Sequence, residues 1–132
     1  MAWTRSDVRF NTPMEQRVGF ARAVRVGPVI TVGGCAAVAQ DGSTVGVGDV
    51  AAQTRRCIEV AAAALKEAGA DLSHVTRTRT LLVDIKYWET AADIRREAFG
   101  DTRPVETIMA VSGFVNPEWL VEMEFDAVIP GG

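Results

Sequence analysis

Residues 121–127 alternate without a break between apolar and acidic side chains, and this pattern constrains the fold more than any other. In an extended strand, successive side chains point to opposite faces of the sheet. One face of this strand is therefore apolar and must be buried, while the other is acidic. The apolar side holds Val121, Met123, Phe125 and Ala127, and the acidic side holds Glu122, Glu124 and Asp126. The pattern predicts a β-sheet that is covered on one face only.

Turn residues and changes of period divide the rest of the chain into strands and helices. Asp49 can cap a helix whose apolar residues recur at helical spacing as far as Ala68. The expected elements are strands at about 20–26 and 29–32, that helix, a strand at 75–83, a second helix at 86–99, and strands at 107–111 and 120–129. The second helix is expected to bury Trp88, Ala91, Ala92, Ala98 and Phe99.

The order of these elements indicates how the domain is built. Asp41-Gly42 marks a turn beside which one more short strand has room, and residues 1–18 are expected to be a loosely packed lead-in. Strands and helices are mixed along residues 1–132, which predicts one α+β domain. Its single mixed β-sheet has two helices packed on one face.

The uncovered face of this sheet carries charges of both signs. In the strand at 75–83, Arg77 and Arg79 point to one face, and Thr76, Thr78 and Thr80 point to the other. The arginines and the carboxylates of the last strand either form a solvated surface or meet at a subunit interface. In the second case, loss of one partner of a desolvated ion pair would be costly.

Composition narrows the classes of function. The net charge is -3 over 132 residues, which gives no electrostatic reason to bind nucleic acid or an anionic membrane. No run of 18 apolar residues occurs, and Cys35 and Cys57 are too few for a disulfide framework or a metal site. We therefore expect a soluble cytoplasmic protein with free thiols, no metal and no cofactor.

Four segments in order resemble the RidA/YjgF family of reactive-intermediate deaminases. They are Gly19–Gly34, Gly48–Ile85, Phe99–Val111 and Leu120–Val128, which reads LVEMEFDAV. The resemblance implies a homotrimer with a chorismate-mutase-like barrel and three clefts between subunits. It also implies a small-molecule substrate, because typical members hydrolyse imines or enamines derived from 2-amino acids.

The residues of the family's site carry over incompletely. In typical members a PAR-motif arginine holds the substrate carboxylate, and here that position is Glu106. The tyrosine of the family aligns with Phe20, and the serine of its SGQ-like segment aligns with Gly33, which is followed two positions later by Cys35. Only the last-strand glutamate, which positions the attacking water, is retained, as Glu122.

This altered site leaves two kinds of function open. If Glu106 and Glu122 lie on neighbouring strands and face one cleft, they cannot both ionise freely, so one pKa rises and the pair supplies an acid and a base. That arrangement predicts a hydrolase or tautomerase acting on a neutral or cationic imine, enamine or enol, in place of archetypal 2-imino-acid deamination. The alternative is a non-catalytic trimer that binds a ligand or acts as a chaperone.

Other candidate pocket residues carry alternatives of their own. Arg22, Arg77 or Arg79 could neutralise Glu106 in a structural ion pair, or one of these arginines could bind a substrate anion from a new position. Cys35 is either a nucleophile or pocket lining, and nearby carboxylates, which raise a thiol pKa, weigh against the first. Besides Phe20, Gly33 and Cys35, the predicted substrate-binding residues are Arg22, Arg77, Arg79, Ile108 and Trp119.

Overall fold

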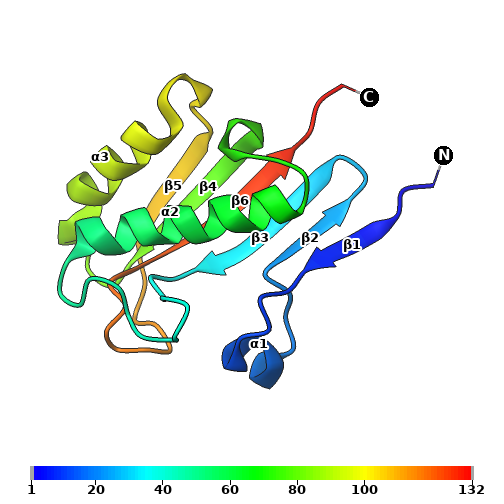
Figure 1. Ribbon diagram of the computed structural model, residues 1–132. Helices are drawn as coiled ribbons and strands as arrows, with labels where there is room; N and C mark the ends of the chain where they lie inside the picture. The colour runs from blue at the N-terminus through cyan, green and yellow to red at the C-terminus, as the bar shows by residue number, and fades with distance from the viewer. Residues whose placement is uncertain (1, 132) are drawn as a thin grey trace.

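The computed structural model describes residues 2–131, which form a six-stranded sheet with two long helices on one face (Figure 1). The strands are β1 (Arg5–Val8), β2 (Ala23–Val26), β3 (Val29–Cys35), β4 (Val75–Leu82), β5 (Val105–Ala110) and β6 (Val121–Val128). The helices are α1 (Pro13–Val18), α2 (Val50–Glu67) and α3 (Trp88–Phe99). Short 3-10 turns occupy Leu72–His74, Ile85–Tyr87 and Gly100–Thr102.

The strand order is β1-β2-β3-β6-β4-β5, so the last strand lies inside the sheet and β1 and β5 form its edges. All neighbours are antiparallel except β4 and β5, which run parallel. Parallel neighbours need a crossover connection, and α3 supplies it here. The predicted α+β fold, with a mixed sheet and helices on one face, is confirmed.

Helix α2 begins where the sequence predicts and covers the centre of the sheet. The Asp49 carboxylate accepts a hydrogen bond from the Ala52 amide at 3.1 Å, which satisfies a free donor at the helix start. Gln53 of this helix is polar but fully buried. Its amide nitrogen donates to the carbonyls of Gly46 and Glu118, and so joins two loops.

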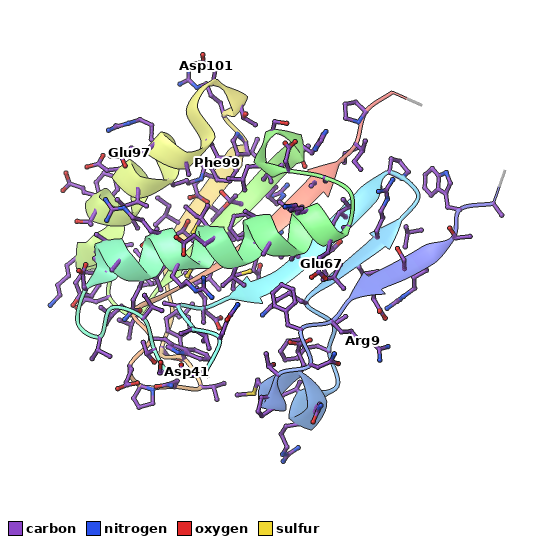
Figure 2. The ribbon with its side chains drawn as sticks, in the orientation of Figure 1. Arg9, Asp41, Glu67, Glu97, Phe99 and Asp101 are labelled. Carbon is purple, nitrogen blue, oxygen red and sulfur yellow. The ribbon has the colours of Figure 1, made fainter. Side chains whose placement is uncertain are left out.

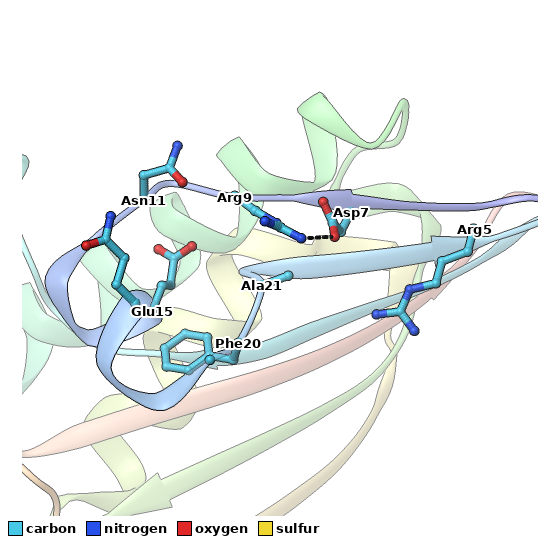
Figure 3. A pocket seen from close by; sticks show the side chains of 9 residues that line it. Arg5, Asp7, Arg9, Asn11, Glu15, Phe20 and Ala21 are labelled. Atoms are coloured by element: carbon cyan, nitrogen blue, oxygen red, sulfur yellow. Dashed lines mark hydrogen bonds and ion pairs between the residues drawn. The ribbon is translucent and has the colours of Figure 1, made fainter.

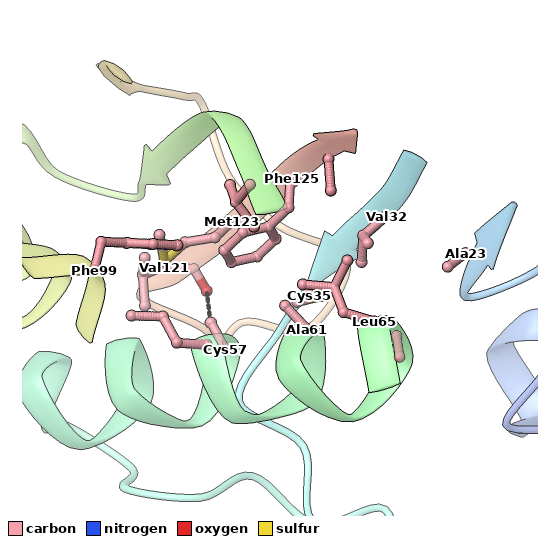
Figure 4. Close-up of a cluster of buried hydrophobic side chains, with 14 of the residues drawn as sticks. Ala23, Val32, Cys35, Cys57, Ala61, Leu65, Phe99, Val121, Met123 and Phe125 are labelled. Carbon is pink, nitrogen blue, oxygen red and sulfur yellow. Dashed lines mark hydrogen bonds between the residues drawn. The ribbon is translucent and has the colours of Figure 1, made fainter. Parts of the chain in front are cut away.

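The core lies between helices α2 and α3 and the apolar side of β6 (Figure 4). Phe125 is 1% exposed and its ring centre lies 6.4 Å from that of Phe99 on α3. Figure 2 shows Phe99 directed toward the sheet, whereas Glu97 on the same helix points outward. The predicted alternation of β6 is confirmed, because its apolar residues are buried and its acidic ones are only partly covered.

The first eighteen residues differ from the expected loose lead-in. β1 pairs with β2 from Arg5↔Val26 to Val8↔Ala23 and widens the sheet by one strand. α1 begins with a capping box in which Thr12 and Glu15 bond each other's backbone. Glu15 is 4% exposed and also accepts a hydrogen bond from the Phe10 amide at 3.0 Å. The polar sequence of β1 gives no alternating pattern that would predict a strand. The Thr-Pro-x-Glu pattern at the start of α1, in contrast, is typical of a helix N-terminus.

Smaller differences occur at element boundaries. Trp88 was expected in the core but is 47% exposed, because α3 begins at this residue and turns its other side to the sheet. Ala98 was also expected in the core but is exposed, and Ile94 is buried instead. The extra strand near Asp41-Gly42 is reduced to an isolated bridge between Val38 and Thr44. No helix in the described part of the chain has the length and apolar character needed to cross a membrane.

Candidate functional site

The face of the sheet opposite the helices carries a ladder of ion pairs between β4 and β6. Arg79 lies opposite Glu124 and approaches it to 3.4 Å, and Arg77 lies opposite Asp126 at 3.8 Å. The prediction that these arginines and carboxylates share a face is confirmed. All four side chains are between 39% and 45% exposed, so each pair contributes about 0–1 kcal/mol to stability.

Glu122 stands at the end of this ladder, beside an irregularity in β3. The register between β3 and β6 shifts between Val32 and Cys35, which places Gly33 and Gly34 in a β-bulge. A Cβ atom on Gly34 would lie 3.2 Å from Oε2 of Glu122. Because glycine has no such atom, the Glu122 carboxylate can rest directly against the backbone of the bulge.

Arg22 lies against the other glycine of the same bulge. A Cβ atom on Gly33 would lie 3.1 Å from Nη2 of Arg22, and that nitrogen donates to the Gly34 carbonyl oxygen at 2.7 Å. The guanidinium also lies over the Phe20 ring, 5.4 Å from its centre. The structure therefore brings four predicted site residues together on the open face, namely Phe20, Arg22, Gly33 and Glu122. We call these four residues the Glu122 cluster.

Charge and burial both act on Glu122. Burial raises the pKa of its carboxyl group above the usual range, Arg22 opposes that rise, and the like charge of Glu124 adds to it. Among residues 2–131, no basic side chain lies within 4.0 Å of the Glu122 carboxylate. Glu122 is therefore a partly desolvated carboxylate that is not held in an ion pair.

Glu106 lies on the opposite face of the sheet, which contradicts the expected carboxylate pair. Its carboxylate contacts Arg95 Nε of α3 at 3.0 Å and accepts a hydrogen bond from Thr80 at 2.7 Å and one from Thr78 at 3.1 Å. The expectation that Glu106 and Glu122 occupy neighbouring strands is wrong, because β4 lies between β5 and β6. The register pairs Glu106 with Thr78, which is buried on the face of the sheet that the helices cover.

The partner of Glu106 was not among the arginines considered from the sequence. An ion pair was one of the alternatives, but it forms with Arg95 and not with Arg22, Arg77 or Arg79. Arg95 also donates to the carbonyl oxygen of Pro104 at 2.6 Å, so it ties α3 to the start of β5. Its position four residues after the buried Ala91 is the one signal that could have placed it on the inner side of α3.

Three other predicted site residues lie away from the Glu122 cluster or beneath it. Cys35 is fully buried in the core, and its thiol donates to the Gly33 carbonyl at 3.3 Å. Burial raises the pKa of that thiol to about 12, which disfavours the thiolate that a nucleophile requires. Ile108 shares the helix side with Glu106, and Trp119 is half-buried in the loop before β6.

A hollow that the sequence did not predict borders the cluster. It has a volume of about 320 Å³ and lies between β1, α1 and the start of β2 (Figure 3). Phe20, Arg9 and Asp7 line it, and the last two form an ion pair of 3.1 Å. Phe20 thus lines the hollow and also lies against the Arg22 guanidinium, so the N-terminal segment forms part of the site's surroundings.

Comparison with known families identifies this architecture. The sequence profile of the Endoribonuclease L-PSP family, which includes the YjgF proteins, matches residues 11–129. The chain belongs to the YjgF family. A crystal structure of a YjgF/YER057c/UK114 family member from Mycobacterium tuberculosis has a TM-score of 0.87 and 36% sequence identity, and covers 96% of this chain and 100% of that one. The fold assignment and the sequence resemblance therefore agree.

Three sequence relatives share most of their length with this YjgF-family chain. An uncharacterized protein of Streptomyces coelicolor is 34% identical, over 91% of this chain and 89% of its own. A RutC family protein of Pyrococcus abyssi is 30% identical, over 89% and 93%. The 3-aminoacrylate deaminase RutC of Acinetobacter baylyi is also 30% identical, over 79% and 82%.

Proposed function

We propose that this chain is an enzyme that hydrolyses a reactive imine or enamine, with Glu122 as the group that moves protons. The setting of Glu122 carries the proposal, since its carboxylate is unpaired on the open face and its pKa is raised by burial. A carboxyl group with a raised pKa is better matched to proton transfer near neutral pH than an ordinary one. The relative named 3-aminoacrylate deaminase acts on an enamine, which supports this reaction class.

The proposed reaction is a hydrolysis that needs only water as its second reactant. Ionised Glu122 takes a proton from water while the water oxygen bonds to the imine carbon, and the C=N π electrons move to nitrogen. Glu122 returns this proton to nitrogen, which gives a carbinolamine. Glu122 then takes the hydroxyl proton and passes it to nitrogen as the C–N bond breaks and the oxygen becomes a carbonyl. An enamine enters the same route after one proton adds to its β-carbon and one leaves its nitrogen. The products are a carbonyl compound and ammonia.

We place this chemistry in a homotrimer, where a second subunit covers the open face and closes the cleft. Two apolar side chains at the edge of that face support such a contact. Val105 is 59% exposed and Met109 is 41% exposed, and on β5 they lie opposite Arg77 and Leu81. Exposed apolar residues on an edge strand favour burial against another chain. Light scattering should give a mass three times 14.2 kDa, and a monomer mass would contradict this part of the proposal.

Ammonia release tests the reaction. Alanine and an amino-acid oxidase generate 2-iminopropanoate in place, and the wild-type protein should accelerate ammonia release above the uncatalysed rate. Glu122→Gln should lower this acceleration by about 100-fold or more, the usual contribution of a general acid–base group.

Glu124→Gln provides the matched control, since it removes the same charge from the same face of the same strand. It should keep most of the acceleration. Full activity in Glu122→Gln would overturn the assigned role. A wild-type protein that accelerates the release of ammonia from neither an imine nor an enamine would favour a ligand-binding trimer without catalysis.

A further inference from the structure

Arg22 differs from the two arginines of the ion-pair ladder on the same face. Arg77 and Arg79 each lie within 4.0 Å of a carboxylate, whereas no carboxylate in the described part of the chain lies that close to Arg22. Its Nη2 donates to the Gly34 carbonyl, and its buried Nε has no hydrogen-bond partner among residues 2–131. Arg22 therefore carries a positive charge that no side chain of the described chain neutralises directly.

The surroundings hold this guanidinium in one orientation. The Phe20 ring packs against it, with 5.4 Å between Cζ of Arg22 and the ring centre. The Gly34 carbonyl fixes one of its two terminal nitrogens. A guanidinium presents its donors as a planar fork that matches both oxygens of a carboxylate. Because Arg22 is already oriented, binding of an anion there loses less conformational freedom than it would at a free side chain.

Arg22 and Glu122 also stand at a spacing that suits a small substrate. They rest against the consecutive residues Gly33 and Gly34, whose Cα atoms are about 3.8 Å apart across a trans peptide bond. Their charges influence each other, since Arg22 opposes the rise in the pKa of Glu122, yet they form no ion pair. A molecule with its carboxylate one or two bonds from its imine carbon could contact both groups at once.

The expectation of a neutral or cationic substrate rested on Glu106 facing the cleft. Glu106 instead lies on the helix side and is neutralised by Arg95 at 3.0 Å. The repulsion that would have excluded an anion is therefore absent from the Glu122 cluster.

We infer that Arg22 binds the carboxylate of a small anionic imine or enamine and so takes the anchoring role that position 106 lacks in this chain. This inference rests on the proposed function for its substrate class. The anion would be held by Arg22 with its reactive carbon toward Glu122, while Phe20 supports the guanidinium.

Binding of a stable product analogue tests this without turnover. Pyruvate is the carbonyl product of 2-iminopropanoate, and pyruvamide is its neutral counterpart. Isothermal titration of the purified protein should show pyruvate binding more tightly than pyruvamide. Arg22→Gln should weaken pyruvate binding by about tenfold or more, as expected when hydrogen bonds to a charged group are lost. Arg22→Lys should recover part of the affinity, because lysine keeps the charge but not the fork.

Arg77→Gln is the control, since it removes one positive charge from the same face and should leave pyruvate affinity within about twofold, because the side chain is exposed and paired. Equal pyruvate affinity in the wild type and in Arg22→Gln would overturn the inference, as would an equal loss in Arg77→Gln. If pyruvate binds through Arg22 but no ammonia is released from the imine, the proposed hydrolysis fails and the anion site stands. If ammonia is released at the same KM in Arg22→Gln, the hydrolysis stands and the anion site fails.

Discussion

Glu106 and Glu122 belong to the same sheet but have opposite environments. Glu106 lies under α3, where Arg95, Thr78 and Thr80 bind its two oxygens. Glu122 lies on the open face beside a glycine bulge, and no basic group of the described residues pairs with it. The first arrangement holds the carboxylate in a structural ion pair, and the second leaves one available for chemistry. Strand order and side-chain parity therefore decide the role of a carboxylate, even where a family motif suggests a different role.

The largest expected effect on stability is at Glu106. Glu106→Ala leaves Arg95 without its carboxylate partner in a setting where both side chains are less than 20% exposed. The loss should cost about 3 kcal/mol of unfolding free energy, the lower end for breaking a buried pair. Urea unfolding monitored by circular dichroism measures it. Arg95→Ala should cost a similar amount, and a double variant much less than the sum would confirm the coupling.

Gly34→Ala tests whether the position of Glu122 against the bulge matters for turnover. An added Cβ would lie 3.2 Å from Oε2 of Glu122, so the carboxylate must shift by a few tenths of an ångström or more. Misplacement of a reacting group can cost up to about 100-fold in rate, so ammonia release should fall by about 10- to 100-fold. Stability should change little, because the displaced atom is the end of a flexible side chain. An unchanged rate would show that the position of Glu122 on the bulge is unimportant.

The pH dependence of turnover should report the raised pKa of Glu122. Below this pKa the carboxyl group is protonated and cannot accept a proton from water. The value of kcat/KM should therefore rise with pH through a value above the ordinary glutamate pKa of about 4.3. A steady-state pH profile measures this. In Glu124→Gln the midpoint should move down, since the like charge of Glu124 contributes to raising the pKa.

The same shift predicts a small effect on stability. Because the folded pKa of Glu122 is raised, its contribution is fully present below the unfolded pKa and is lost as pH rises through the folded value. Glu122→Gln should therefore raise the Tm slightly at pH 7 and leave it unchanged near pH 3. Thermal unfolding at the two pH values checks the sign. A lower Tm at pH 7 would mean that the ionised carboxylate stabilises the fold.

The smallest effect is expected in the ion-pair ladder. Arg77→Gln removes one side of a pair at 3.8 Å whose members are 45% and 39% exposed. Loss of such a pair should change the unfolding free energy by less than about 1 kcal/mol. The same urea measurement, made at low and high salt, should show that even this difference shrinks as the charges are screened.

The parts of this structure that depend on local periodicity could be predicted from the sequence. The alternation in β6 correctly placed Phe125 in the core and Glu122 on the opposite face, and Asp49 marked the start of α2. Long, strongly periodic segments give such signals because burial imposes the period on the sequence. β1 was missed because four largely polar residues on an edge strand bury too little to leave a pattern.

The site was predictable only where it depended on one strand. The insertion of β4 between β5 and β6 is a long-range property, and no local pattern around Glu106 records it. Arg95 was missed for the same reason, since its partner lies on a strand that the sequence does not place beneath α3. The bulge at Gly33-Gly34 was visible only as a glycine pair, and its meaning depends on which side chains rest against it.

The most direct test compares Glu106→Gln with Glu122→Gln, which make the same chemical change on opposite faces of the sheet. Both variants are assayed for ammonia release from an imine and for thermal unfolding at pH 7. Glu106→Gln should unfold at a lower temperature and keep most of its turnover, while Glu122→Gln should lose turnover without a fall in Tm. Turnover lost in Glu106→Gln but kept in Glu122→Gln would contradict the assignment of the two carboxylates.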